Sequence, residues 1–156
     1  PTAISLDLEP PAGFRRYVNG PSGVSLWVPE SWTVIEPGPH GGSTILQSYP
    51  QDKYVGGEPR QPGDAKCDLT VHPSGVRMAE VIQQLRSGFH TTIVSEREII
   101  LNSGRSGIRF EIESMARSLS LVTTLQTAAA DERTVVLTCF GETAPFDEIA
   151  VSLGTR

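Results

Sequence analysis

The chain has 156 residues, of which 38% are hydrophobic and 20% charged, and its formal net charge is -5. This composition is typical of one globular domain with a sizeable core, and it excludes the disordered and fibrous classes. The negative charge disfavours nucleic acid and anionic lipid as partners. No apolar run reaches the roughly 18 residues that a membrane-spanning helix needs. Because the chain starts with Pro1 rather than Met, we expect a processed or trimmed form, from which any signal peptide or lipid anchor has been removed.

The N-terminal half is predicted to contain a leader, three short strands and a long loop. Consecutive prolines forbid a helix in the extended leader, residues 1–13. Strands are expected over 14–18, 24–28 and 44–49, and the second ends at Pro29 because proline cannot donate to a ladder. The loop over 50–65 offers little apolar area to offset its ordering entropy, so we expect it to be the least ordered internal stretch.

The centre of the chain changes from a strand period to a helix period. Cys67, Leu69 and Val71 alternate with polar residues, which predicts a half-buried strand. An apolar stripe at helical spacing then follows, formed by Met78, Val81, Ile82, Leu85 and Phe89. Ser74 is the expected N-cap of this helix and Gly88 the expected C′ residue.

The C-terminal half is predicted to be a meander of strands closed by a second helix. The strands are expected over 92–101, 108–113, 119–127 and 133–140. The last of these is apolar on both faces, so it should be central. A helix follows Pro145, with apolar residues on one face. The order predicts a single domain over 14–156 of the α+β class, in which helices cover an antiparallel sheet of about six strands.

Three stretches make the layout resemble the PsbP-like family. The first is the pattern G-x-S-L-x-x-P-x-x-W, which here contains Gly23, Leu26, Pro29 and Trp32. The second is the helix after CDLTVHP, and the third is the ending VVLTCFGETAPFDEIAVSL. The resemblance implies an α/β/α sandwich. The family includes extrinsic proteins of photosystem II, and a nuclear import factor that binds the small GTPase Ran shares its fold.

The aromatic residues divide into structural and contact candidates. In the family's pattern the tryptophan after the proline caps the core, so Trp32 is expected to be buried. Trp27 has the opposite strand parity from Val24, Leu26 and Val28, which makes it a candidate for ligand or partner contact. Tyr54, in the 50–65 loop, is the second such candidate.

No catalytic motif assembles from the sequence. The nucleophile elbow, the P-loop, the dinucleotide fingerprint and zinc-ligand spacings are all missing. The three histidines, His40, His72 and His90, are interpreted as ordinary loop, strand and helix-end residues. Glu111 and Glu113 share a strand face, which is typical of the solvated side of a sheet. We therefore predict no catalytic, cofactor-binding or metal residue and no cofactor.

The two cysteines have two interpretations. Alternation places Cys67 and Cys139 on covered faces of their strands. If these strands are neighbours and the residues lie opposite, a disulfide forms. The alternative is a pair of buried free thiols.

The leading hypothesis is a non-enzymatic, extracytoplasmic accessory or binding domain whose partner is a protein or a small molecule. One alternative is a small enzyme or ligand carrier with its site under the 50–65 loop. Another is an intracellular protein-binding regulator. A fold is no warrant for choosing among them.

Overall fold

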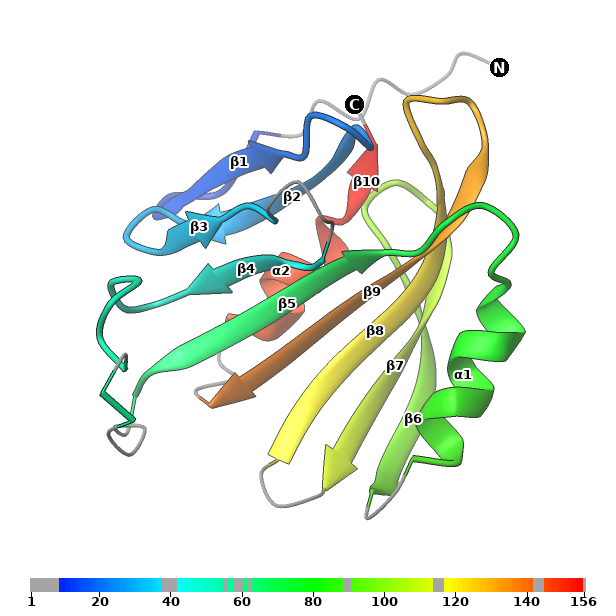
Figure 1. Ribbon diagram of the computed structural model, residues 1–156. Coiled ribbons are helices and arrows are strands. Elements are labelled where there is room, and N and C mark those ends of the chain that lie inside the picture. The colour runs from blue at the N-terminus through cyan, green and yellow to red at the C-terminus, as the bar shows by residue number, and fades with distance from the viewer. Residues whose placement is uncertain are drawn as a thin grey trace.

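The computed structural model describes residues 9–37, 42–54, 56–57, 61, 63–88, 91–113, 117–141 and 145–155. Within these ranges the chain forms two antiparallel sheets and two helices (Figure 1). Residues 1–8, most of the expected leader, lie outside the described part.

The larger sheet has seven strands in the order β3-β4-β5-β9-β8-β7-β6. Their bounds are β3 (Thr33–Ile35), β4 (Thr44–Gln47), β5 (Ala65–Val71), β6 (Thr92–Ile100), β7 (Ser106–Glu113), β8 (Arg117–Gln126) and β9 (Glu132–Gly141). The smaller sheet has three strands in the order β1-β2-β10. Its strands are β1 (Phe14–Val18), β2 (Val24–Pro29) and β10 (Gly154–Thr155). The helices are α1 (Met78–Arg86) and α2 (Phe146–Val151).

The central strands of the larger sheet are covered on both faces, as the apolar pattern of β9 predicted. β9 lies between β5 and β8, and buried residues occur on both of its parities. β8 is buried at six successive positions, from Ser118 to Thr123, and again at Leu125 after the intermediate Thr124. Two-sided burial is expected where different elements cover the two faces of a sheet. Figure 1 shows α1 in front of this sheet and α2 behind it.

Two apolar cores follow from this arrangement. The larger core lies between the seven-stranded sheet, the three-stranded sheet and α2, and it contains Val24, Leu26 and Val28 of β2. The smaller core lies under α1, where Val81 packs with Phe110 of β7. The stripe that predicted α1 is therefore the face that the helix buries.

The fold differs from the expected sandwich in being richer in strands. The prediction of about six strands in one helix-covered sheet is wrong, because the described residues form seven strands in one sheet and three in another. The smaller sheet and α2 together cover the face that a helix layer was expected to cover. The two strands that were missed, β3 and β10, have only three and two residues. So short a segment shows no readable alternation.

The N-terminal end of α1 also differs from the prediction. The N-cap is Arg77, without a side-chain cap, and not Ser74. The helix ends at Arg86, and the hydroxyl of Ser87 donates to the carbonyl of Gln83 at 2.8 Å. The C-cap is Ser87, so Gly88 occupies the C′ position as predicted, and Phe89 lies outside the described residues. Burial of the apolar face under the sheet outweighs the missing N-terminal cap, which is worth about 1 kcal/mol.

One hydroxyl joins the smaller sheet to α2. Ser152 Oγ donates to the carbonyl of Ile149 at 2.6 Å and accepts from the backbone N–H of Trp27 at 2.7 Å. β10 pairs only with Ser25 and Val24 of β2. The Ser152 hydroxyl therefore accepts the next edge hydrogen bond of β2, from Trp27, where the pairing with β10 stops. The side chain at position 152 therefore extends the sheet by one hydrogen bond.

Candidate functional site: the loop between β4 and β5

The candidate contact residue Tyr54 lies in the loop that joins β4 to β5. Its ring meets the ring of Tyr49 edge to face, with centroids 4.9 Å apart and planes at 86°. Tyr49 is buried, with 7% of its surface exposed. Such an aromatic pair stabilises by about 0.5–1.5 kcal/mol beyond its burial. The described part of the loop therefore has an apolar anchor of its own.

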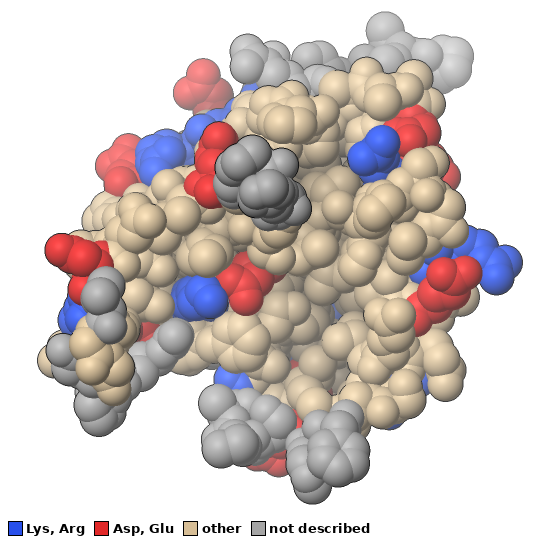
Figure 2. All heavy atoms as spheres, in the orientation of Figure 1, with Lys and Arg blue, Asp and Glu red and all other residues tan. Residues whose placement is uncertain are grey.

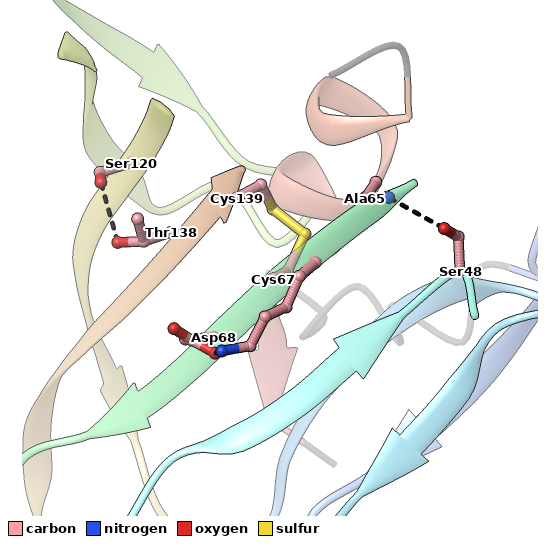
Figure 3. The surroundings of a disulfide bond; sticks show 8 residues. Ser48, Ala65, Cys67, Asp68, Ser120, Thr138 and Cys139 are labelled. Carbon is pink, nitrogen blue, oxygen red and sulfur yellow. Dashed lines mark hydrogen bonds and ion pairs between the residues drawn. A yellow bond between two sulfur atoms is a disulfide. The ribbon is translucent and has the colours of Figure 1, made fainter. Parts of the chain in front are cut away.

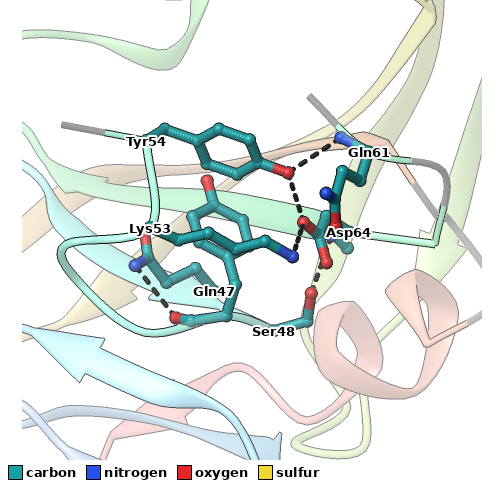
Figure 4. A network of polar contacts seen from close by, with 8 residues as sticks. Gln47, Ser48, Lys53, Tyr54, Gln61 and Asp64 are labelled. Atoms are coloured by element: carbon teal, nitrogen blue, oxygen red, sulfur yellow. Dashed lines mark hydrogen bonds and ion pairs between the residues drawn. The ribbon is translucent and has the colours of Figure 1, made fainter. Parts of the chain in front are cut away.

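The carboxylate of Asp64 accepts hydrogen bonds from polar groups of the same loop. Lys53 Nζ donates to Asp64 Oδ2 at 2.7 Å, and the hydroxyl of Tyr54 donates to the same oxygen. The Tyr54 hydroxyl in turn accepts from the backbone N–H of Gln61 at 2.8 Å. Figure 4 shows these three side chains converging beside β4 and β5. The hydrogen bond to Asp64 raises the pKa of Lys53 above its ordinary value.

This arrangement holds together the described residues Lys53, Tyr54, Gln61 and Asp64. The Asp64 side chain is only 14% exposed and its charge is balanced by Lys53. The hydroxyl of Tyr54 is engaged as both donor and acceptor. A partner that approaches Tyr54 would therefore meet its ring and not its hydroxyl. A charge-assisted network of this kind holds a backbone in one geometry.

The base of the loop is tied down by the backbone. Ser48 N–H donates to the carbonyl of Ala65, and Ala65 N–H donates to the hydroxyl of Ser48, both at 2.9 Å. Gly141 ends β9 with a φ of +88°, and a Cβ there would lie 2.2 Å from the carbonyl oxygen of Asp64. Only glycine allows this close approach of two backbones.

A disulfide lies two residues inside this base. Cys67 of β5 and Cys139 of β9 are directly opposite in the register, with Cα atoms 4.0 Å apart and the sulfur atoms bonded. Both residues are almost fully buried in the larger core, together with Phe146 and Ile149 of α2. Figure 3 shows the bond spanning the two strands, with α2 close to it. Of the two interpretations of the cysteines, the structure therefore bears out the disulfide and not the pair of free thiols.

The opposite face of the same strands carries a polar row. Asp68, Thr138 and Ser120 are aligned across β5, β9 and β8. The hydroxyls of Ser120 and Thr138 are hydrogen-bonded at 2.8 Å (Figure 3). Asp68 Oδ1 is buried without a hydrogen bond, and its neighbour is Lys66 Nζ at 3.4 Å. This ion pair is what balances the charge of the aspartate.

The charged residues on the surface around this row do not form an area of one sign of charge. Figure 2 gives the same view with all atoms, and acidic and basic residues lie beside one another there, mostly toward the outline. Uncharged residues fill much of the middle. Long-range steering of a highly charged partner needs a large area of one sign. The face shown in Figure 2 offers no such area.

Trp27, the other contact candidate, lies on a different sheet from Tyr54. It stands opposite Arg16 in the β1–β2 pair, on the side of β2 that faces away from Val24, Leu26 and Val28. It is half-buried. The structure therefore places the two candidates on separate elements, one on the smaller sheet and one on the loop of the larger sheet. Their use in binding stays a prediction.

Trp32 behaves as expected, and the acidic pair does so only at Glu113. Trp32 is 9% exposed within the larger core, and its carbonyl accepts from Arg15 at 3.2 Å. Its expected burial is confirmed. Glu111 forms an ion pair with Arg117 across the β7–β8 hairpin, but its side chain is only 18% exposed and it stands opposite the core residue Leu119. The interpretation of a solvated sheet face therefore holds for the exposed Glu113 and not for Glu111.

Of the three histidines, the described part of the chain contains His72 alone. The backbone N–H of His72 donates to the carbonyl of Thr134 at 2.9 Å, so this residue extends the β5–β9 ladder. His40 and His90 lie outside the described residues. Within the described ranges, no group of three or more metal-ligating side chains gathers. The same ranges contain no helix long and apolar enough to cross a membrane.

Sequence reasoning missed Lys53 and Asp64. Both belong to the polar loop 50–65, where a lysine and an aspartate eleven residues apart give no signal of pairing. The expectation that this loop is the least ordered internal stretch stays a prediction. Residues 55, 58–60 and 62 of it lie outside the described part.

The Lys53–Asp64 pair leads to a prediction about alkaline pH. A lysine pKa that is raised in the folded state contributes stability fully below the unfolded pKa of about 10.4, and this contribution is lost as pH rises through the higher folded pKa. We expect the difference in unfolding free energy between wild type and Lys53→Met to be constant from about pH 7 to pH 10 and to shrink above. Denaturant melts across this range measure it. In the Asp64→Asn background the pH dependence should vanish, and a difference that grows above pH 10 would contradict the assignment.

Comparison with known proteins agrees with the fold. No family model matches the chain, and no curated protein matches it. The solution structure of cyanobacterial PsbP (CyanoP) from Synechocystis sp. PCC 6803 is similar over 94% of this chain and 94% of that chain, with a TM-score of 0.56 and 12% sequence identity. The crystal structure of the Saccharomyces cerevisiae Ran-binding protein Mog1p covers 89% of this chain and 86% of that chain, with a TM-score of 0.43 and 10% identity.

The chain therefore has a PsbP-like fold, as its P-x-x-W element and its ending predicted. At 12% identity this likeness shows the architecture and not a shared activity.

Proposed function

We propose that this chain is a non-enzymatic accessory or binding domain that contacts a partner protein outside the cytoplasm. The observation that carries the proposal is the buried disulfide between Cys67 and Cys139. Disulfides persist in oxidising compartments and are rare where cellular thiols are kept reduced. The fold adds support, because the PsbP-like family that the sequence resembles includes extrinsic proteins that act by attachment to a larger assembly.

The proposed contact surfaces are the outer side of β2 around Trp27 and the β4–β5 loop around Tyr54. Trp27 is half-buried on the side of β2 opposite to the core, and Tyr54 is held in place by Asp64 and Tyr49. Pre-ordered aromatic side chains contact a partner at low entropic cost, and they are enriched at the energetic centres of interfaces. A segment before Pro1 would supply the membrane tether.

Two measurements in the cells that make the protein test this proposal. Acid quenching followed by alkylation without reduction should find both cysteines protected and the chain in the extracytoplasmic fraction. A photo-reactive side chain at Trp27, or at the exposed Asp52 beside Tyr54, should cross-link one defined protein. The same group at the exposed Gln84 of α1 serves as the control.

The captured protein must then bind the purified chain, and Trp27→Ala or Tyr54→Ala should weaken that binding. Two alkylated thiols and a cytoplasmic chain would instead favour the intracellular regulator. A small molecule that co-purifies and protects the 50–65 loop from protease, without any cross-linked protein, would favour the carrier.

A further inference from the structure

Strand β6 is an open edge of the seven-stranded sheet. Among the described residues its one strand neighbour is β7, and it is nine residues long. Seven of its nine residues are exposed, the exceptions being Ile93 and Ile99. An uncovered edge of this length presents a row of unpaired backbone donors and acceptors, which is a template for another strand.

The two large hydrophobic side chains exposed most in the described chain both lie on this edge. Val94 is 52% exposed and Ile100 is 62% exposed. Val94 sits at a bulge, where the register shifts between Ile93 and Ser95. The regular part of the edge therefore runs from Ser95 to Ile100. The exposed side chain of Val94 lies just before it, and that of Ile100 lies at its end.

Between Val94 and Ile100, the acidic and basic side chains of β6 lie on opposite faces of the sheet. Glu96 and Glu98 stand opposite Phe110 and Ile108, whose side chains face α1, and Arg86 of α1 pairs with Glu96. Arg97 stands opposite Arg109, which pairs with Asp147 of α2. The edge is thus acidic on its α1 side and basic on its α2 side.

This pattern disfavours a second copy of the chain. When two identical edges pair antiparallel in one continuous sheet, opposite residues must lie on the same face, so their numbers add up to an even sum. The three central registers then place Glu96 opposite Glu96, Arg97 opposite Arg97, or Glu98 opposite Glu98. Like charges directly opposite are destabilising, and charged edges are a known protection against self-pairing.

We propose that β6 accepts an extended segment of the partner protein in which a basic, an acidic and a basic residue alternate. In antiparallel pairing the two basic residues would lie opposite Glu98 and Glu96, and the acidic residue opposite Arg97. An apolar residue two positions before this triplet would lie opposite Ile100 and cover it. Main-chain hydrogen bonds supply the affinity in this mode, and alternate side chains supply the specificity. The inference rests on the proposed binding function and names the surface and the chemistry of its partner.

A pair of nine-residue peptides tests the proposal. The first has lysine, glutamate and lysine at the three central positions between isoleucine residues. The second has glutamate, lysine and glutamate there. Calorimetric titration of the purified chain should give at least about tenfold tighter binding of the first peptide, since three opposite-charge pairs replace three like-charge pairs. Hydrogen exchange should show new protection of β6 amides only.

A charge-swapped protein provides the matched experiment. The variant Glu96→Lys/Arg97→Glu/Glu98→Lys should reverse the preference and bind the second peptide more tightly. Glu148→Lys, at an exposed position of α2, changes the net charge by the same amount and should keep the original preference. Equal binding of both peptides, no binding of either, or dimerisation of the free chain through β6 would overturn the proposal. The cross-linking at Trp27 and Asp52 stays informative in that event, because neither residue belongs to this edge.

Discussion

Removal of the disulfide is expected to lower the free energy of unfolding by about 4 kcal/mol. The bond joins residues 72 positions apart, and closing a loop of that length removes about this much entropy from the unfolded chain. Equilibrium denaturant melts of the oxidised protein, the reduced protein and the double variant Cys67→Ala/Cys139→Ala measure the effect. The bridge lies between strands that are already paired along seven positions, so the sheet should survive its loss.

Two controls separate the bond from the packing of the sulfur atoms. A reductant should destabilise the wild type and leave the double alanine variant unchanged. Titration of the unreduced, denatured wild type should find no free thiol. Finding two thiols would remove the disulfide, and with it the main support for an extracytoplasmic location.

Replacement of Trp32 by alanine is expected to cost about 3–5 kcal/mol, as truncation of a large core residue does. Trp32 is 9% exposed and belongs to the core shared by the two sheets and α2. Circular dichroism should follow the melts, because the substitution also removes a fluorophore.

Trp27→Ala is the matched control, since the chain has only these two tryptophans. Trp27 is half-buried on the other side of β2, and the backbone hydrogen bond that Ser152 accepts from it does not depend on its side chain. We expect it to cost less than half as much as Trp32→Ala. A cost for Trp32→Ala within about 0.5 kcal/mol would mean that Trp32 is a surface residue.

Local patterns predicted the parts of the fold in which one face of an element is buried against a neighbour. Alternation in β5 and β9 placed Cys67 and Cys139 on covered faces of their strands, and the structure confirms this burial. Their position directly opposite each other comes from the register of the two strands. The stripe of α1 is buried as expected. In each case a repeated side-chain period reports burial directly.

The parts that were missed depend on contacts between distant segments. β10 is two residues long and pairs with β2 near the other end of the chain. The separation of β1 and β2 into a sheet of their own follows from this pairing and from the hydrogen bond between Ser152 and Trp27, which are 125 residues apart. No local period encodes such a contact.

The candidate site was predictable in its aromatic residues and not in its polar ones. Tyr54 was singled out because it is a large ring in a polar loop. Asp64 and Lys53 are ordinary charged residues of that loop, and their role comes from a geometry that Gly141 permits at the end of β9. Charged side chains acquire specific partners only when the backbone has brought them together.

The closing strand β10 has a consequence for how the protein is made. β2 is flanked by β1 and by β10, so the smaller sheet gains its third strand only after residues 154–155 have emerged from the ribosome. Contacts between such distant segments slow folding, because the loop entropy must be lost before the contact forms. Until then β2 lacks α2 on its apolar side and β10 along its edge. Chaperones that bind exposed hydrophobic surface would therefore bind the nascent chain at β2.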